Sequence, residues 1–103
     1  MGRAEPIKDV NDSEVKFAAG QAVKIHNDQK HDTLVFIRVV NGLKQEVDTA
    51  KLYSLLIEAT NGDGTHWGYI AKIKLWPKAP SHYDPYSHTF ELISWEDPLK
   101  FWN

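Results

Sequence analysis

The residues best suited to chemistry lie in one proline-rich stretch near the C-terminus, SHYDPYSH. It contains His82, Asp84 and His88, and such side chains bind divalent metals. Their spacing matches no established set of metal ligands, so we interpret the stretch as a solvent-exposed loop. Tyr83 and Tyr86 fit loop packing better than recognition of a protein, although tyrosine is enriched in recognition loops. The sequence therefore predicts no metal site and no cofactor.

No pattern of residues is typical of an enzyme. The absence of cysteine excludes a thiol nucleophile and a zinc site with thiolate ligands. Serine, histidine and aspartate are present, but no nucleophile elbow or phosphate-binding loop accompanies them. We therefore predict that the protein is not an enzyme. A fold without disulfides tolerates a cytoplasmic or a secreted location, and the start MGRAEPIKDV lacks the apolar core of a signal peptide.

The composition is that of an ordinary soluble globular protein, with 42% apolar and 25% charged residues. Its net charge is −2 and it has no basic run, so we expect neither nucleic acid nor a membrane surface as partner. No apolar run approaches the ~20 residues of a membrane span. A chain of 103 residues can form one modest core, so we predict a single domain over residues 1–103.

One amphipathic helix is predicted within NDSEVKFAAGQAVKIHN. Its apolar residues recur at the spacing of one helix face, and these are Val15, Ala18, Ala19, Ala22 and Val23. Asn11, Asp12 or Ser13 can cap its start. Gly20 lowers helix stability by roughly 1 kcal/mol relative to alanine. Three alanines and a glycine give the helix a thin face, which suits packing across a curved sheet.

Strands are predicted in DTLVFIRVVNGLKQEV, LYSLLIEA, HWGYIAKIKLW and TFELISWED. Asn61–Gly64, NGDG, predicts a hairpin turn. Residues 1–5 are predicted to be a flexible tail, followed by a short edge strand with Ile7 and Val10. Two sets of alternating residues are predicted to face the core: Tyr53, Leu55, Ile57 and Ala59, then Trp67, Tyr69, Ala71, Ile73 and Leu75. The fold class is α+β, with one antiparallel sheet curled around the helix.

The position of the first hairpin is ambiguous from the residues alone. Asn41-Gly42 is a strong local signal for a hairpin turn, but glycine within a strand also marks a bulge. Glu46–Ala50 lies between two β-prone segments and contains neither glycine nor proline. Local signals favour a turn at Asn41-Gly42, whereas the spacing of the strands also allows one at Glu46–Ala50.

The chain resembles a cystatin, most closely a plant cystatin, over about residues 5–95. The resemblance rests on PIKDVNDSEVKFAAGQAVKIHN, LVFIRVV, LYSLLIEA, NGDG and YIAKIKLWPK in this order and spacing. The family's helix signature is a small-to-apolar run that ends in His-Asn, here Ala22–Asn27, and Gln21 stands where the family prefers an aromatic residue. The resemblance implies one long helix wrapped by a four- to five-stranded antiparallel sheet. It also places the first turn at Glu46–Ala50 and makes Asn41-Gly42 a bulge.

Cystatins inhibit papain-like cysteine proteases without covalent chemistry. The resemblance implies that three segments at one end of the sheet, the N-terminal tail and two hairpin loops, enter the active-site cleft of the protease. Preorganised loops bury apolar surface at little cost in ordering. The residues that we predict to contact the protease are Gly2, Arg3, Ala4, Glu5, Pro6, Gln45, Glu46, Val47, Asp48, Thr49, Ala50, Trp76, Pro77 and Lys78.

All three segments depart from the cystatin pattern. The tail has one glycine, Gly2, in place of a pair. The family's Gln-x-Val-x-Gly aligns with Glu46–Ala50, where Gln45 is one residue too early and Ala50 replaces the glycine. A shift of one residue keeps Gln45 but displaces Val47 and puts Thr49 at the glycine position. The family's Pro-Trp is replaced by Trp76–Lys78, which sends the tryptophan ring to the opposite face of a strand. A desolvated Asp48 carboxylate and the Cβ of Ala50 oppose insertion into a papain-like cleft.

We predict a protease inhibitor that acts by reversible occlusion of an active-site cleft, with cysteine proteases as the first target class. Divergent relatives of plant cystatins include the squash aspartic proteinase inhibitor and phloem filament proteins. Because the departures are expected if the target has changed, an aspartic protease is the alternative target, and a non-inhibitory structural or phloem role is a third possibility. Cystatin folds exchange their helix and first strand between chains, so we expect a monomer or a domain-swapped dimer.

Overall fold

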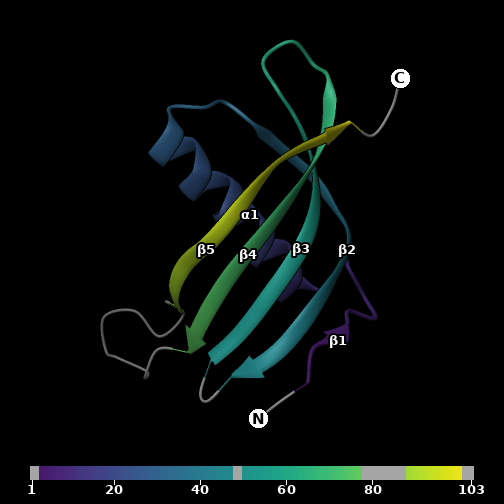
Figure 1. Ribbon diagram of the computed structural model, residues 1–103, viewed down its shortest axis with the longest axis vertical. Helices are drawn as coiled ribbons and strands as arrows, with labels where there is room; N and C mark the ends of the chain where they lie inside the picture. The colour runs from purple at the N-terminus through teal and green to yellow at the C-terminus, as the bar shows by residue number, and fades with distance from the viewer. Residues whose placement is uncertain (1–2, 48–49, 78–87, 101–103) are drawn as a thin grey trace.

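A computed structural model describes residues 3–47, 50–77 and 88–100, which form one helix and five strands. All strand pairs are antiparallel, and the order in the sheet, β1-β2-β3-β4-β5, follows the chain. Figure 1 shows the curved sheet lying across α1. The elements are β1 (Glu5–Pro6), α1 (Ser13–Lys30), β2 (Val35–Val47), β3 (Ala50–Thr60), β4 (His66–Pro77) and β5 (His88–Lys100). The predicted α+β fold is confirmed.

The helix α1 buries the face that the sequence predicted. Val15, Ala18, Ala19, Ala22 and Val23 are all at most 4% exposed. Asp12 precedes the first helical residue, as expected for a cap position. These small side chains allow the helix axis to approach the sheet closely.

The inner face of the sheet also follows the predicted alternation. Eight residues of β3 and β4 are at most 7% exposed and belong to the same core as the helix: Tyr53, Leu55, Ile57, Ala59, Tyr69, Ala71, Ile73 and Leu75. Trp67 is partly buried against this core, so its predicted place on the sheet face is confirmed, and Trp95 packs against the same core. Lys72 and Lys74 alternate with the buried residues of β4 and lie on the outer face.

The first hairpin turns after Val47, and β2 continues straight through Asn41-Gly42. The register with β3 shifts between Val39 and Asn41, which confirms the bulge. Glycine is required at position 42 because a Cβ atom there would lie 2.7 Å from the carbonyl oxygen of Ser54. Such a distance is far inside van der Waals contact.

The second turn, at Asn61–Thr65, is held by its own hydrogen bonds. The Asn61 N–H donates to the Thr65 carbonyl oxygen at 3.2 Å, and the Gly64 N–H donates to the Asn61 carbonyl oxygen at 3.0 Å. Gly64 has a φ of +83°, a left-handed conformation that favours glycine. The predicted NGDG turn is confirmed.

The edge strand β1 is shorter and earlier than the sequence suggested. Glu5 and Pro6 pair with Lys44 and Leu43 of β2. The Ile7 N–H donates to the Gly42 carbonyl oxygen at 2.9 Å, after which the chain turns toward α1. Ile7 and Val10, which we expected in the strand, instead pack as partly buried side chains against the core. Within the described ranges, no helix combines the length and apolar character needed to cross a membrane.

Candidate functional site

The predicted contact segments converge on one end of the sheet. Ala50 begins β3 next to Val47, and the following residue, Lys51, pairs with Leu75 of β4. Trp76 and Pro77 at the end of β4 therefore lie beside the start of β3. In Figure 1 the end of β2, the start of β3 and the end of β4 are at the lower end of the sheet.

The tail joins the same end by running along β2. Arg3, Glu5, Lys44 and Glu46 line one groove, which places the tail beside the last residues of β2. The described contact candidates at this end are Arg3, Ala4, Glu5, Pro6, Gln45, Glu46, Val47, Ala50, Trp76 and Pro77. Other predicted residues lie outside the described part of the chain: Gly2, Asp48, Thr49, Lys78, and His82, Tyr83, Asp84 and Tyr86 of the proline-rich loop. Contact with a protease stays a prediction for the whole set.

Ala50, the residue that stands at the family's glycine position, lies in the strand pair that closes the first hairpin. Val47 and Ala50 pair across the hairpin, and Ala50 is only 3% exposed. Its methyl group is therefore covered by the molecule itself. We expected this Cβ to oppose insertion into a cleft, but its burial removes that objection at position 50. Val47 is partly exposed and remains available to a partner.

Trp76 lies on the outer face of the sheet, opposite the helix. It follows Leu75, which is buried on the inner face, and successive side chains of a strand point to opposite faces. The Lys74 ammonium group is 4.9 Å from the centroid of the Trp76 ring, at the distance of a cation–π contact. This contact holds the partly exposed ring along β4.

One polar contact at the base of the first hairpin was not predicted from the sequence. The Glu14 Oε1 atom, in the first turn of α1, accepts hydrogen bonds from the Lys51 Nζ atom at 2.8 Å and from the Tyr53 hydroxyl group. Burial, and then the Glu14 carboxylate, raise the pKa of Tyr53 above its usual range. The available signal was Tyr53 on the core face, because a buried tyrosine hydroxyl group needs a hydrogen-bond partner.

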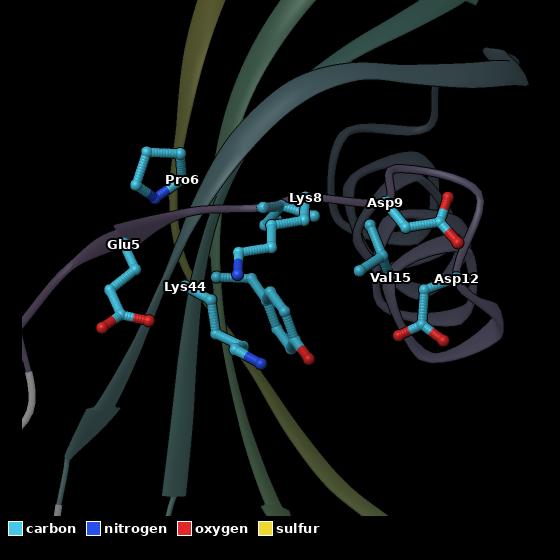
Figure 2. Close-up of a pocket in the computed structure, with 9 residues that line it drawn as sticks. Glu5, Pro6, Lys8, Asp9, Asp12, Val15 and Lys44 are labelled. Atoms are coloured by element: carbon cyan, nitrogen blue, oxygen red, sulfur yellow. The ribbon is translucent and has the colours of Figure 1, made fainter.

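A pocket of about 370 Å³ separates the tail from the start of α1. Figure 2 shows Glu5, Pro6 and Lys8 along the N-terminal segment, with Asp9, Asp12 and Val15 toward the helix. Ile7, Lys44 and Tyr53 complete the lining. Because both signs of charge line the pocket, it does not favour a ligand of one charge.

A second polar cluster lies on the outer face of the sheet. The Glu58 carboxylate, with a side chain only 4% exposed, accepts hydrogen bonds from Arg38 Nε at 2.7 Å and from a ring nitrogen of His66. The three residues come from the adjacent strands β2, β3 and β4. The cluster links these strands on the face away from α1, and we assign it a structural role.

One family model matches nearly the whole chain. It is named SQAPI, is described as aspartic acid proteinase inhibitor, and matches residues 7–98. The match begins directly after β1 and ends within β5, so it includes both strands of the first hairpin, β2 and β3. No curated protein matches the sequence. The matched family is related to the cystatins, in agreement with the fold, and its members are protease inhibitors. The chain therefore belongs to the SQAPI family of aspartic acid proteinase inhibitors.

Proposed function

We propose that the protein is a reversible, non-covalent inhibitor of an aspartic protease. The family match over residues 7–98 is the observation that carries this proposal. The inhibitor occludes the active-site cleft with the end of the sheet formed by the tail, the first hairpin and the end of β4. Cysteine proteases, which the sequence suggested first, become the second candidate class.

The departures from the cystatin pattern support a change of target. The ring of Trp76 lies along the outer face against Lys74, whereas the cystatin order places a tryptophan after the proline. The first hairpin closes on a Val47–Ala50 strand pair and has no glycine at position 50. The position of the Trp76 ring alters the surface that cystatins present to papain-like enzymes, whereas the buried methyl group of Ala50 adds nothing to that surface. The scaffold that holds the three segments together is retained.

Titration of two proteases distinguishes the candidate functions. Pepsin and papain, each at nanomolar concentration, are incubated with the protein up to micromolar concentration, and residual activity is measured. We expect loss of pepsin activity with papain unaffected. Loss of papain activity alone would favour the cystatin-like target. Full activity of both enzymes would contradict the inhibitor proposal for these two classes and favour the non-inhibitory role. Size-exclusion chromatography of the mixture shows whether a monomer or a dimer binds.

A pair of identical substitutions in β2 tests whether the proposed end of the sheet makes the contact. Val47→Asp places a carboxylate at the first hairpin, where desolvation on binding is costly. Val35→Asp is the control, because Val35 is 57% exposed and lies at the opposite end of the same strand. We expect Val47→Asp to weaken inhibition at least about tenfold, which corresponds to about 1.4 kcal/mol. Equal inhibition by both variants would place the contact elsewhere.

A further inference from the structure

The buried face of α1 offers little to fix the helix along the sheet. Three of its five buried residues are alanines, whose methyl groups interdigitate weakly with the opposing strands. Directional contacts therefore have a larger share in setting its position. Ring contacts of Phe17 and His26 join the helix to β5. Two polar contacts, made by Glu14 and Asn27, lie near opposite ends of the helix.

At the C-terminal end, the Asn27 side chain binds the chain that enters β2. Its Nδ2 atom donates to the Leu34 carbonyl oxygen at 2.9 Å, and its Oδ1 atom accepts from the Leu34 N–H at 3.1 Å. This contact explains why an asparagine stands in the His-Asn pair of the helix. Leu34 directly precedes β2, so this contact lies at the opposite end of that strand from the first hairpin.

At the N-terminal end, Glu14 binds the base of the first hairpin directly. Lys51 and Tyr53, its two donors, lie in β3 one and three residues after Ala50. Their partners on β2 are Glu46 and Lys44, which line the groove beside the tail. The carboxylate thus ties the helix to the strand pair that carries the candidate loop.

The two hydrogen bonds to Glu14 differ in strength because their donors differ in solvent exposure. The side chains of Lys51 and Glu14 are 38% and 31% exposed, so solvent screens their ion pair. Tyr53 is 1% exposed, and its hydroxyl group gives a charge-assisted hydrogen bond to the carboxylate. Loss of that acceptor would leave a buried donor poorly satisfied, which is costly.

We infer that Glu14 is a positioning residue for the first hairpin. The hydrogen bonds from Lys51 and Tyr53 to Glu14 orient the start of β3 relative to the helix. A hairpin held in this way needs less ordering when it binds. The expected effect of Glu14 on affinity rests on the proposed inhibition of a protease, whereas its effect on the hairpin does not.

Substitutions at the two ends of the helix test this role. Glu14→Ala removes the acceptor of two hydrogen bonds at the hairpin, and Asn27→Ala removes two at the other end. Thermal unfolding establishes that the variants fold and how far each is destabilised. We expect Glu14→Ala to weaken inhibition of pepsin about tenfold, and Asn27→Ala less than about twofold at a comparable loss of stability.

Two milder variants keep the test informative if Glu14→Ala does not fold. Glu14→Gln retains an acceptor oxygen for both donors, so it should restore most of the affinity. Tyr53→Phe retains the buried ring but removes the hydroxyl group, so it should weaken inhibition about threefold to tenfold. Equal affinity losses for Tyr53→Phe and Asn27→Ala at equal stability would overturn the inference, because a purely structural role predicts that equality.

Amide hydrogen exchange separates failure of this inference from failure of the proposed function. Glu14→Ala should accelerate exchange at residues 44–47 and 50–53 more than Asn27→Ala does, whether or not a protease is inhibited. If the native protein inhibits neither enzyme but this difference appears, the proposed function fails and the positioning role stands. If exchange at the hairpin is the same in both variants, the positioning role is wrong.

Discussion

The two Asn-Gly pairs of this protein adopt different structures. Asn61-Gly62 opens the turn between β3 and β4, where the Asn61 side chain accepts hydrogen bonds from the N–H groups of Asp63 and Thr65, each at 3.2 Å. Asn41-Gly42 lies inside β2 and forms a bulge with no change of direction. The same dipeptide is therefore a turn in one place and part of a continuous strand in the other.

The flanking residues decide between these outcomes. Val39 and Leu43, on either side of the first pair, belong to a 13-residue strand that pairs with β3 along most of its length. A turn at Asn41-Gly42 would forfeit that pairing, whereas the local preference of the dipeptide is worth only about 1 kcal/mol. The second pair has polar and glycine neighbours, so no competing strand forms. Four predictions test this difference by substitutions at one of the pairs or beside it, and one of them uses a glycine of α1 for comparison.

Replacement of Gly42 and of Gly62 by alanine should give the largest difference in stability. A Cβ atom at Gly42 would lie 2.7 Å from a backbone oxygen and 2.8 Å from a Leu55 methyl group, whereas at Gly62 the nearest atom is 3.8 Å away. We expect Gly42→Ala to lower the free energy of unfolding by about 3 kcal/mol and Gly62→Ala to change it by less than about 0.5 kcal/mol. Urea unfolding measures both. A small loss for Gly42→Ala would mean that the bulge relaxes easily.

Replacement of Asn61 and of Asn41 by alanine should give the second largest difference in stability. Asn61→Ala removes the acceptor of two backbone N–H groups, so we expect a loss of about 1 to 2 kcal/mol. Asn41 is exposed, and Asn41→Ala should cost less than about 0.5 kcal/mol. Thermal unfolding of both variants checks the difference. Equal losses would show that the Asn61 side chain does not stabilise the turn.

A third pair uses the same substitution with opposite expected signs. Gly64 has a φ of +83°, so Gly64→Ala should destabilise the protein by about 1 kcal/mol through backbone strain. Gly20 lies within α1, and a Cβ atom added there would meet no atom within 4 Å, so Gly20→Ala should stabilise the protein by about 1 kcal/mol. Chemical unfolding gives both values. Destabilisation by Gly20→Ala would indicate that the helix needs a closer approach there.

The smallest effect concerns the charge of Asp63 in the second turn. Hydrogen bonds from the side chain and the backbone N–H of Thr65 hold the pKa of the Asp63 carboxyl group below its usual value. A lowered pKa in the folded state contributes stability above the unfolded value of about 3.9, and this contribution is lost as the pH falls through the folded value. Asp63→Asn should therefore be less stable than the native protein at pH 7 and nearly equal at about pH 2. A difference that does not change with pH would contradict this linkage.

Much of the scaffold could be predicted from periodicity. The positions of Val15, Ala18 and Ala22 along the helix, and the alternation of Ile73 and Leu75 with lysines, follow from burial of one face. The turn at Asn61–Gly64 follows from local chemistry. Each of these features depends on residues close together in the sequence, so a local pattern is sufficient to predict it.

The remaining features depend on residues far apart in the sequence. The contact of Glu14 with Tyr53 joins the first turn of the helix to β3, and no local pattern pairs them. The start of β1 at Glu5 depends on where β2 offers free backbone groups. The correct turn after Val47 came from the resemblance to cystatins, since the local signal favoured Asn41-Gly42. The class of the target protease cannot be predicted from sequence periodicity, because it depends on the shape of the partner.

The sequential order of the strands has a consequence for how the chain folds. β2, β3 and β4 each pair with the next strand along the chain, and each of these three hairpins closes over a connection shorter than the one between β1 and β2. β1 pairs with the far part of β2, and the whole of α1 lies between them. Loop-closure entropy makes this the most expensive contact to form early. We expect β1 to dock last during folding and to open first in the native state, so that the tail is the part of the candidate site with the shortest lifetime in its folded position.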